Sequence, residues 1–215
     1  MLRNASKGFT LLEMAIVLLI VGLMLGSLLM PLTHQMENTK RKQTKETLQL
    51  VHDALLGFAI SNGRLPCPDS DGDGVENSPC ANTEGDLPWT TLGIGREDAW
   101  HNRFRYRADN AFATTIPDPP DTTSGLSVTD LSGNALTSAD PHAPVAIIFS
   151  CGNDGLPNGE NDANGAINNP TCENPGAGNT TYVQDIYADN SFDDLLIWIS
   201  KHTLLNRVVA AGQWP

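Results

Sequence analysis

The acidic residues at positions 69, 71 and 73 offer the clearest metal-binding chemistry in the chain. They lie in the run Asp69-Ser70-Asp71-Gly72-Asp73-Gly74, where carboxylates alternate with small residues. Alternate carboxylates can point at one cation, and this spacing matches the first half of an EF-hand calcium loop. Cys80 replaces the closing glutamate of the full pattern, although Glu76 could close a shorter loop. Asp69, Asp71 and Asp73 are therefore candidate Ca²⁺ ligands, and the alternative is an acidic turn without metal.

No set of side chains has the spacing of a catalytic site. The histidines are scattered without the spacing of metal ligands, and no Gly-x-Ser-x-Gly nucleophile motif is present. These histidines are His34, His52, His101, His142 and His202. We therefore expect that the protein is not an enzyme.

The formal charge of −12 opposes binding to nucleic acid, because an acidic surface repels phosphate backbones. The basic cluster at residues 40–45 is small enough to be a solvated helix face. No nucleic-acid partner is expected.

Four cysteines, Cys67, Cys80, Cys151 and Cys172, allow three disulfide pairings, and the sequence alone does not choose among them. Our preference is Cys67 with Cys80 and Cys151 with Cys172, because each pair closes a short local loop. Such bonds persist only in an oxidising compartment.

An uncharged apolar run from Met14 to Leu32 has the length of a membrane span. As a helix these 19 residues would extend about 28 Å, close to the hydrocarbon thickness of a bilayer. Arg3 and Lys7 precede the run without any acidic residue, which holds the N-terminus in the cytoplasm. A single-pass topology with an exported remainder is therefore predicted.

The residues in front of this run carry a recognisable signature. The stretch Lys7-Gly8-Phe9-Thr10-Leu11-Leu12-Glu13 resembles the cleavage and methylation signature of type IV prepilins and type II secretion pseudopilins. The resemblance implies that a prepilin peptidase removes the leader, residues 1–8, by cutting after Gly8, and then methylates the amine of Phe9. It also implies that Glu13 meets the amine of a neighbouring subunit during assembly.

Two other interpretations of this N-terminus remain open. Glu13 lies near a helix end, so its carboxylate could instead extend to the membrane interface. An ordinary secretory signal peptide would need a small-residue cleavage site after the apolar run, but the only small pair nearby is Gly26-Ser27, which lies within the run.

Beyond the apolar run the helical pattern continues. Leu48, Val51, Leu55, Leu56 and Ala59 follow a helical period, and Asn62-Gly63 is a good C-terminal cap. One long helix over residues 9–62, with its membrane span at 14–32, is therefore predicted. Residues 63–215 are expected to form an exported domain. The fold class is α+β, with the helix packed on a small antiparallel sheet in a pilin-like arrangement.

The exported part divides into strands and polar loops. Residues 64–88 are rich in Pro, Gly and Asp and predict a loop, whereas 108–143 predict an insertion outside the core. Val145 to Phe149 predict the central strand, and 192–200 the last strand. The stretch 97–106 resembles the Asp-Pro-Trp-Gly-x-x-Tyr-x-Tyr segment of major pseudopilins, where a strand begins. Ala99 and His101 replace its proline and glycine.

A second possible calcium site follows the central strand. Residues 150–165 resemble the calcium-binding loop of pseudopilins, which implies Asp154 and Asp162 as leading ligands, with Glu160 and Asn164 in reserve. Oxygen donors on a glycine-rich turn suit Ca²⁺. The alternative is an acidic surface loop held by the disulfide of Cys151.

The sequence therefore predicts a structural subunit, a pseudopilin or minor pilin of a type II secretion pseudopilus or type IV pilus. Its expected partners are prepilin peptidase, other pilin or pseudopilin subunits, the inner-membrane assembly platform and the membrane. The expected location is the bacterial inner membrane, with the domain in the periplasm. From a different class, the alternative is a membrane-tethered exported enzyme or calcium-dependent binding module outside any filament.

Overall fold

A computed structural model describes residues 8, 10–80, 83–116, 122–138, 142–161, 172, 179–188 and 191–213, with the side chains of 26–33 and 160 left aside. The chain forms two compact units, which meet between Lys40 and Arg41 and are described separately. Helix α1, Leu11–Asn62, contributes to both units.

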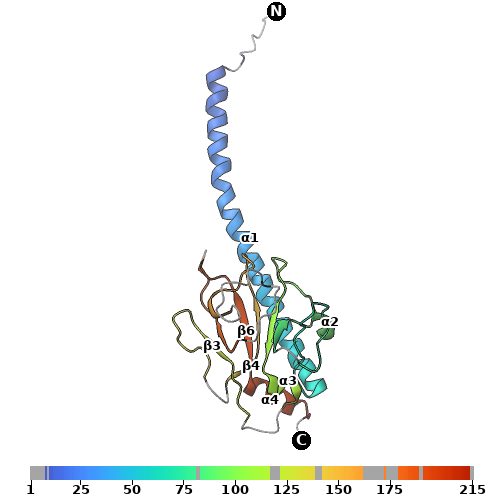
Figure 1. Ribbon diagram of the computed structural model, residues 1–215. Helices are drawn as coiled ribbons and strands as arrows, with labels where there is room; N and C mark the ends of the chain where they lie inside the picture. The colour runs from blue at the N-terminus through green and yellow to red at the C-terminus, as the bar shows by residue number, and fades with distance from the viewer. Residues whose placement is uncertain are drawn as a thin grey trace, which may run out of the picture. The chain divides into compact units, whose positions relative to one another are not determined.

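The first unit is the beginning of α1 (Figure 1). Its large apolar side chains are exposed, Leu12 at 71%, Leu18 at 67% and Leu23 at 69%. Among the described residues, no helix contains an apolar stretch long enough to cross a membrane. The span predicted at 14–32 includes side chains outside the described set and stays a prediction.

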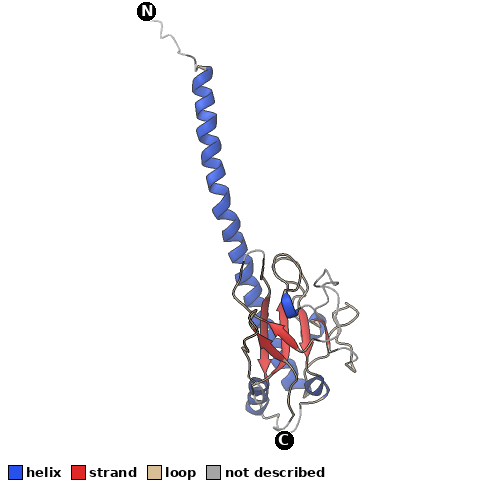
Figure 2. Ribbon diagram, turned by 60° about the vertical axis from the view of Figure 1, so that its left-hand side comes forward, coloured by secondary structure: helices blue, strands red, loops and turns tan. Residues whose placement is uncertain are grey.

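The second unit is an α+β fold, as predicted, built on an antiparallel sheet of order β1-β2-β4-β6 (Figure 2). The strands are β1 Glu84–Asp86, β2 Arg105–Ala108, β4 Pro144–Ser150 and β6 Leu195–Ser200. A second, two-stranded sheet pairs β3, Ser127–Thr129, in parallel with β5, Thr181–Val183. The short helices are α2 Trp89–Leu92, α3 Asn110–Thr114, the 3₁₀ turn η1 Gly159–Asn161, and α4 Lys201–Ala210.

The last three turns of α1 pack on one face of the sheet. The predicted stripe from Leu48 to Ala59 is buried in one cluster with Tyr106 and Ile148. The helix ends at Asn62, as expected, because Gly63 adopts a left-handed φ of 67° and donates its N–H to the Ala59 carbonyl at 2.9 Å.

The opposite face of the sheet has its own apolar layer. Ile147 and Phe149 of β4 pack there with Val128 of β3 and Tyr182 of β5. Successive residues of a strand point to opposite faces, so β4 contributes to both clusters and is buried along its whole length. This explains why the central strand has a continuous apolar sequence.

Two expectations for the loops were wrong. Residues 108–143 are not a plain insertion, because Phe112 of α3 and Val128 of β3 are fully buried in the core. The loop predicted over 64–88 contains β1, whose backbone pairs with β2. In the 97–106 stretch the strand begins only at Arg105, and Trp100 lies in the preceding turn.

His101 occupies that turn with an unusual backbone. Its φ is +73°, the left-handed region that glycine adopts without strain. The turn thus keeps the conformation suited to the glycine that the pseudopilin segment has here. The imidazole Nδ1 lies 3.4 Å from Glu97 Oε2, an exposed contact that contributes little to stability.

Replacing His101 with glycine should stabilise the protein. Relief of left-handed strain exceeds the entropy that glycine adds to the unfolded chain, so we expect a gain of about 0.5 to 1 kcal/mol in the free energy of unfolding. Urea unfolding of the full-length chain measures this gain. The control His101→Ala removes the imidazole but keeps Cβ, and should not be stabilised. Equal stability of both variants would show that the turn carries no strain.

Candidate functional site

The end of the N-terminal signature, from Thr10 to Glu13, forms the start of α1. Gly8 is exposed, and Phe9 lies outside the described residues. The Glu13 N–H donates to Thr10 Oγ1 at 3.2 Å, and the Thr10 N–H donates to Glu13 Oε2 at 3.5 Å. This reciprocal pattern is a capping box, which satisfies otherwise unpaired N–H groups at the start of α1. Glu13 therefore has a role within its own helix, which Thr10-x-x-Glu13 could have revealed in the sequence.

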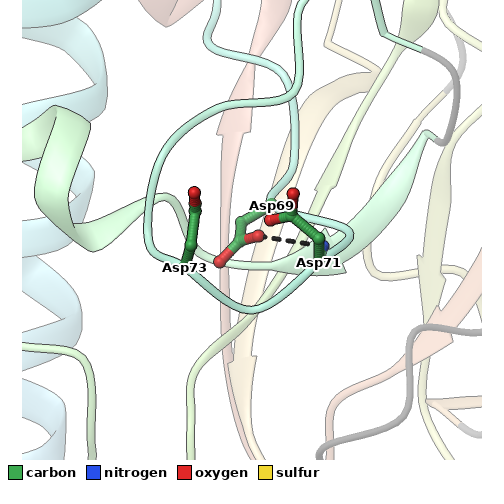
Figure 3. Close-up of side chains that lie close together, drawn as sticks. All are labelled: Asp69, Asp71 and Asp73. Carbon is green, nitrogen blue, oxygen red and sulfur yellow. Dashed lines mark hydrogen bonds between the residues drawn. The ribbon is translucent and has the colours of Figure 1, made fainter.

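The acidic loop at 69–74 gathers three carboxylates. Oxygen atoms of Asp69, Asp71 and Asp73 lie within 4.8 Å of one another, with Asp69 buried and the other two exposed (Figure 3). Asp69 Oδ1 accepts the N–H groups of Asp71 at 3.1 Å and Gly72 at 2.7 Å, and Oδ2 accepts that of Gly74 at 2.8 Å. The loop is therefore wrapped around the Asp69 carboxylate.

The two exposed carboxylates are held less tightly. Asp71 Oδ2 accepts from the Asn77 side chain at 3.2 Å, and Asp73 Oδ1 accepts from the Val75 N–H at 2.7 Å. The hydrogen bond from Asn77 is the main cause that lowers the pKa of Asp71. Each carboxylate keeps an oxygen that can face a cation, and hard oxygen ligands suit Ca²⁺.

Rigid elements hold both ends of this loop. Asp69 and Asp86 exchange backbone hydrogen bonds of 3.0 and 2.8 Å, which attaches the loop to β1. The predicted disulfide between Cys67 and Cys80 is present. Gly74 has a φ of +85°, and a Cβ there would collide with the Trp89 indole, so this turn requires glycine.

Glu76 is bound by Arg64 instead of facing the three aspartates, which disfavours the shorter-loop alternative. Its two carboxylate oxygens accept hydrogen bonds of 2.7 Å from the Arg64 guanidinium, and Oε2 also accepts the Cys67 N–H at 2.9 Å. Burial alone would raise the pKa of Glu76, but the hydrogen bonds and charge of Arg64 outweigh it and hold this pKa below its usual value. Glu76 therefore fastens the acidic loop to the end of α1.

The second predicted calcium loop is described only in part. Asp162 and Asn164 lie outside the described residues, as does the side chain of Glu160. Asp154 is exposed, and its Oδ1 accepts the Leu156 N–H at 2.8 Å within the same loop. The predicted disulfide between Cys151 and Cys172 is present.

Two further carboxylates, which sequence reasoning did not assign to this loop, organise it. Asp193 Oδ2 accepts the N–H groups of Asn153 and Asp154 at 2.5 and 3.0 Å. Asp194 Oδ2 accepts from the Asn161 side chain at 2.7 Å, and burial raises the pKa of Asp194 to about 8. The adjacent acids before β6 were the available signal, but their contacts with a loop about forty residues earlier depend on the fold.

Residues 3–29 match the family model described as the prokaryotic N-terminal methylation motif, the prepilin-type signature of type IV pilins and pseudopilins. No curated protein and no solved structure matches the chain. The predicted resemblance to the prepilin signature is thus confirmed for residues 3–29.

The motif supports a precursor of the pilin or pseudopilin type. It implies processing by a prepilin peptidase, assembly with other pilin subunits, and an N-terminal membrane anchor.

Glu76→Gln should destabilise the protein at pH 7 by about 1 to 3 kcal/mol, because charged hydrogen bonds to Arg64 and Cys67 are weakened. Since the folded-state pKa is depressed, this contribution is complete above the unfolded pKa and is lost as pH falls below about 4. Urea unfolding at pH 7 and pH 3 should therefore show the two proteins converging in acid.

The matched control is Glu46→Gln, which removes an exposed ion pair with Lys42 at 3.8 Å. This change should cost little at either pH. An unchanged pH dependence in Glu76→Gln would contradict the role given to the Arg64 pair.

Proposed function

We propose that this protein is a structural subunit, a pseudopilin or minor pilin, that prepilin peptidase processes and an inner-membrane platform assembles into a pseudopilus or type IV pilus. The observation that carries the proposal is the methylation motif over residues 3–29. Under this proposal the peptidase cuts after Gly8 and methylates Phe9, and Glu13 then lies four residues from the new N-terminus.

The physical character of α1 supports this function. Its first turns expose apolar side chains such as Leu18 and Leu23. A helix that is apolar around its circumference needs burial in lipid or among other helices. A pilin-type subunit uses both environments in turn, the inner membrane before assembly and the filament core afterwards.

The second unit fits an exported location. Its two disulfides each close a short loop, and such bonds persist in the periplasm but not in a reducing cytosol. The acidic surface disfavours a nucleic-acid partner. The alternative is a tethered exported enzyme or binding module, for which neither cleavage after Gly8 nor the charge of Glu13 is needed.

Gly8→Ala should block processing, whereas Glu13→Gln should be processed but fail to enter filaments. Gln at the third helical position preserves a capping box, so this variant removes the charge without removing the helix cap. The readouts are the intact mass of the N-terminus, with and without prepilin peptidase, and the amount of protein in sheared filaments.

Gly57→Ala is the matched control, because Gly57 lies outside the apolar start of α1, is exposed, and a Cβ there meets no atom within 4 Å. It should be processed and assembled as in the wild type. An unprocessed Met1, or cleavage beyond residue 26, would favour the tethered or secreted alternative. Normal assembly of Glu13→Gln would limit Glu13 to its capping role.

We also propose that the loop at residues 69–74 binds Ca²⁺. The close approach of Asp69, Asp71 and Asp73 favours this loop over residues 150–165, where Asp154 is the one described candidate side chain. A bound ion would bridge carboxylates that otherwise repel one another, and would rigidify a loop that Arg64 and the Cys67 disulfide already hold at its ends.

Calcium should raise the thermal midpoint of the wild type by several degrees relative to chelator, because binding to the folded state stabilises it. Asp71→Asn with Asp73→Asn should abolish the shift. The control Asp130→Asn alters another exposed aspartate turn, capped by its own loop, and should keep the shift. Equal midpoints with calcium and chelator would exclude the metal, and a full shift in the double variant would place it elsewhere.

A further inference from the structure

Two histidines that lie 60 positions apart in the sequence meet in the second unit. The ring centroids of His142 and His202 are 5.7 Å apart, and their planes are inclined by 47°, so the rings are not stacked. Both residues are exposed. Imidazoles that converge in this way from separate elements are potential ligands for one metal ion.

The backbone fixes this juxtaposition. Pro144 of β4 lies opposite Ser200 of β6, and the Lys201 N–H donates to the Ala143 carbonyl at 3.0 Å. The ladder ends there and α4 begins at Lys201, so His142 in the segment before β4 and His202 in the first turn of α4 lie beyond the same end of the ladder. Ser200 caps α4 by accepting the Thr203 N–H at 3.1 Å, so the segment that carries His202 is also fixed.

The separation suits coordination by both rings. With Zn–N distances of about 2.0 to 2.1 Å and a tetrahedral angle, two imidazole centroids on one ion lie roughly 5 Å apart. The observed 5.7 Å needs a closure of less than about 1 Å, which small rotations of two exposed side chains provide.

A third residue orients one of the rings. The Asn206 amide Nδ2 lies 3.0 Å from His202 Nδ1, one turn further along α4. With the amide rotated by 180°, its oxygen accepts the Nδ1–H, and Nε2 is left as the free ligand atom. The oxygen and nitrogen positions of an amide are interchangeable assignments, and ligand histidines are commonly held by such an acceptor.

We propose that His142 and His202 form a binding site for a transition-metal cation, Zn²⁺ or Cu²⁺, with Asn206 as a positioning residue. Imidazole nitrogen selects these ions over Ca²⁺, which prefers oxygen. Water completes the coordination. The ion would connect the start of β4 to the start of α4, and the net charge of −12 favours the approach of cations.

Isothermal titration of the untagged full-length chain in detergent, with ZnCl₂ and with CuCl₂, tests the site. We expect a wild-type binding step that His142→Ala and His202→Ala each weaken at least tenfold. Asn206→Ala should weaken it about tenfold, since loss of a supporting acceptor typically has this effect. Circular dichroism and intact disulfides verify that each variant is folded.

His101→Ala is the matched control, because His101 is another exposed histidine that lies beside a carboxylate instead of a second imidazole. It should leave the step unchanged, as should Asp71→Asn and an excess of Ca²⁺, which separates this site from the acidic loop. Absence of a saturable step, or a step retained in the His142→Ala, His202→Ala double variant, would overturn the proposal.

Discussion

Residues 48–59 of α1 bury an apolar face against the four-stranded sheet, and the opposite face of that sheet is covered by β3, β5 and the Cys151–Cys172 disulfide. The central strand β4 can be apolar on both faces only because both layers are present. Each layer also anchors a loop, since Arg64 follows the end of α1 and holds Glu76, while Cys172 bonds to the residue after β4. The positions of both acidic loops therefore depend on this sandwich of layers.

A buried polar network joins the two sheets through β1 and β2. Glu84 accepts hydrogen bonds from the Arg105 guanidinium at 2.9 Å and from the Tyr182 hydroxyl at 2.6 Å, and Arg105 also donates to the Cys172 carbonyl at 3.0 Å. Burial and the Glu84 charge raise the pKa of Tyr182, which keeps the hydroxyl protonated as a donor. A buried ion pair contributes little net free energy of unfolding, because desolvation offsets its attraction. The network therefore acts mainly by fixing the positions of β5 and of the Cys151–Cys172 disulfide against the four-stranded sheet.

Local signals in the sequence predicted the elements whose structure is decided locally. The stripe of α1, the Asn62-Gly63 end, the strand from Val145 and the two short-range disulfides all belong to this class. Phe112 and Val128 were missed because their polar surroundings resemble a loop. Val128 is buried where β3 pairs with β5 more than fifty residues later, and Phe112 is buried in the cluster formed with α1. The contacts of Asp193 with the 153–154 turn and the approach of His142 to His202 also join residues far apart in the sequence, so no local pattern predicted them. The pairing of Glu76 with Arg64 was not visible in the sequence either, because Arg64 lies outside the acidic motif.

The hydrogen bonds already present limit what metals can contribute to this fold. Asp69 is satisfied by three backbone N–H groups, and His142 and His202 lie just beyond the end of the β4–β6 ladder, where α4 begins. Neither arrangement needs an ion to form, since a disulfide and backbone hydrogen bonds hold the acidic loop and a backbone hydrogen bond between Lys201 and Ala143 holds the residues next to the two histidines. A metal that binds only the folded state then adds stability that grows with the logarithm of its concentration, without creating the structure that it binds. A domain of this kind would remain folded when metal is scarce and become more rigid when metal is present.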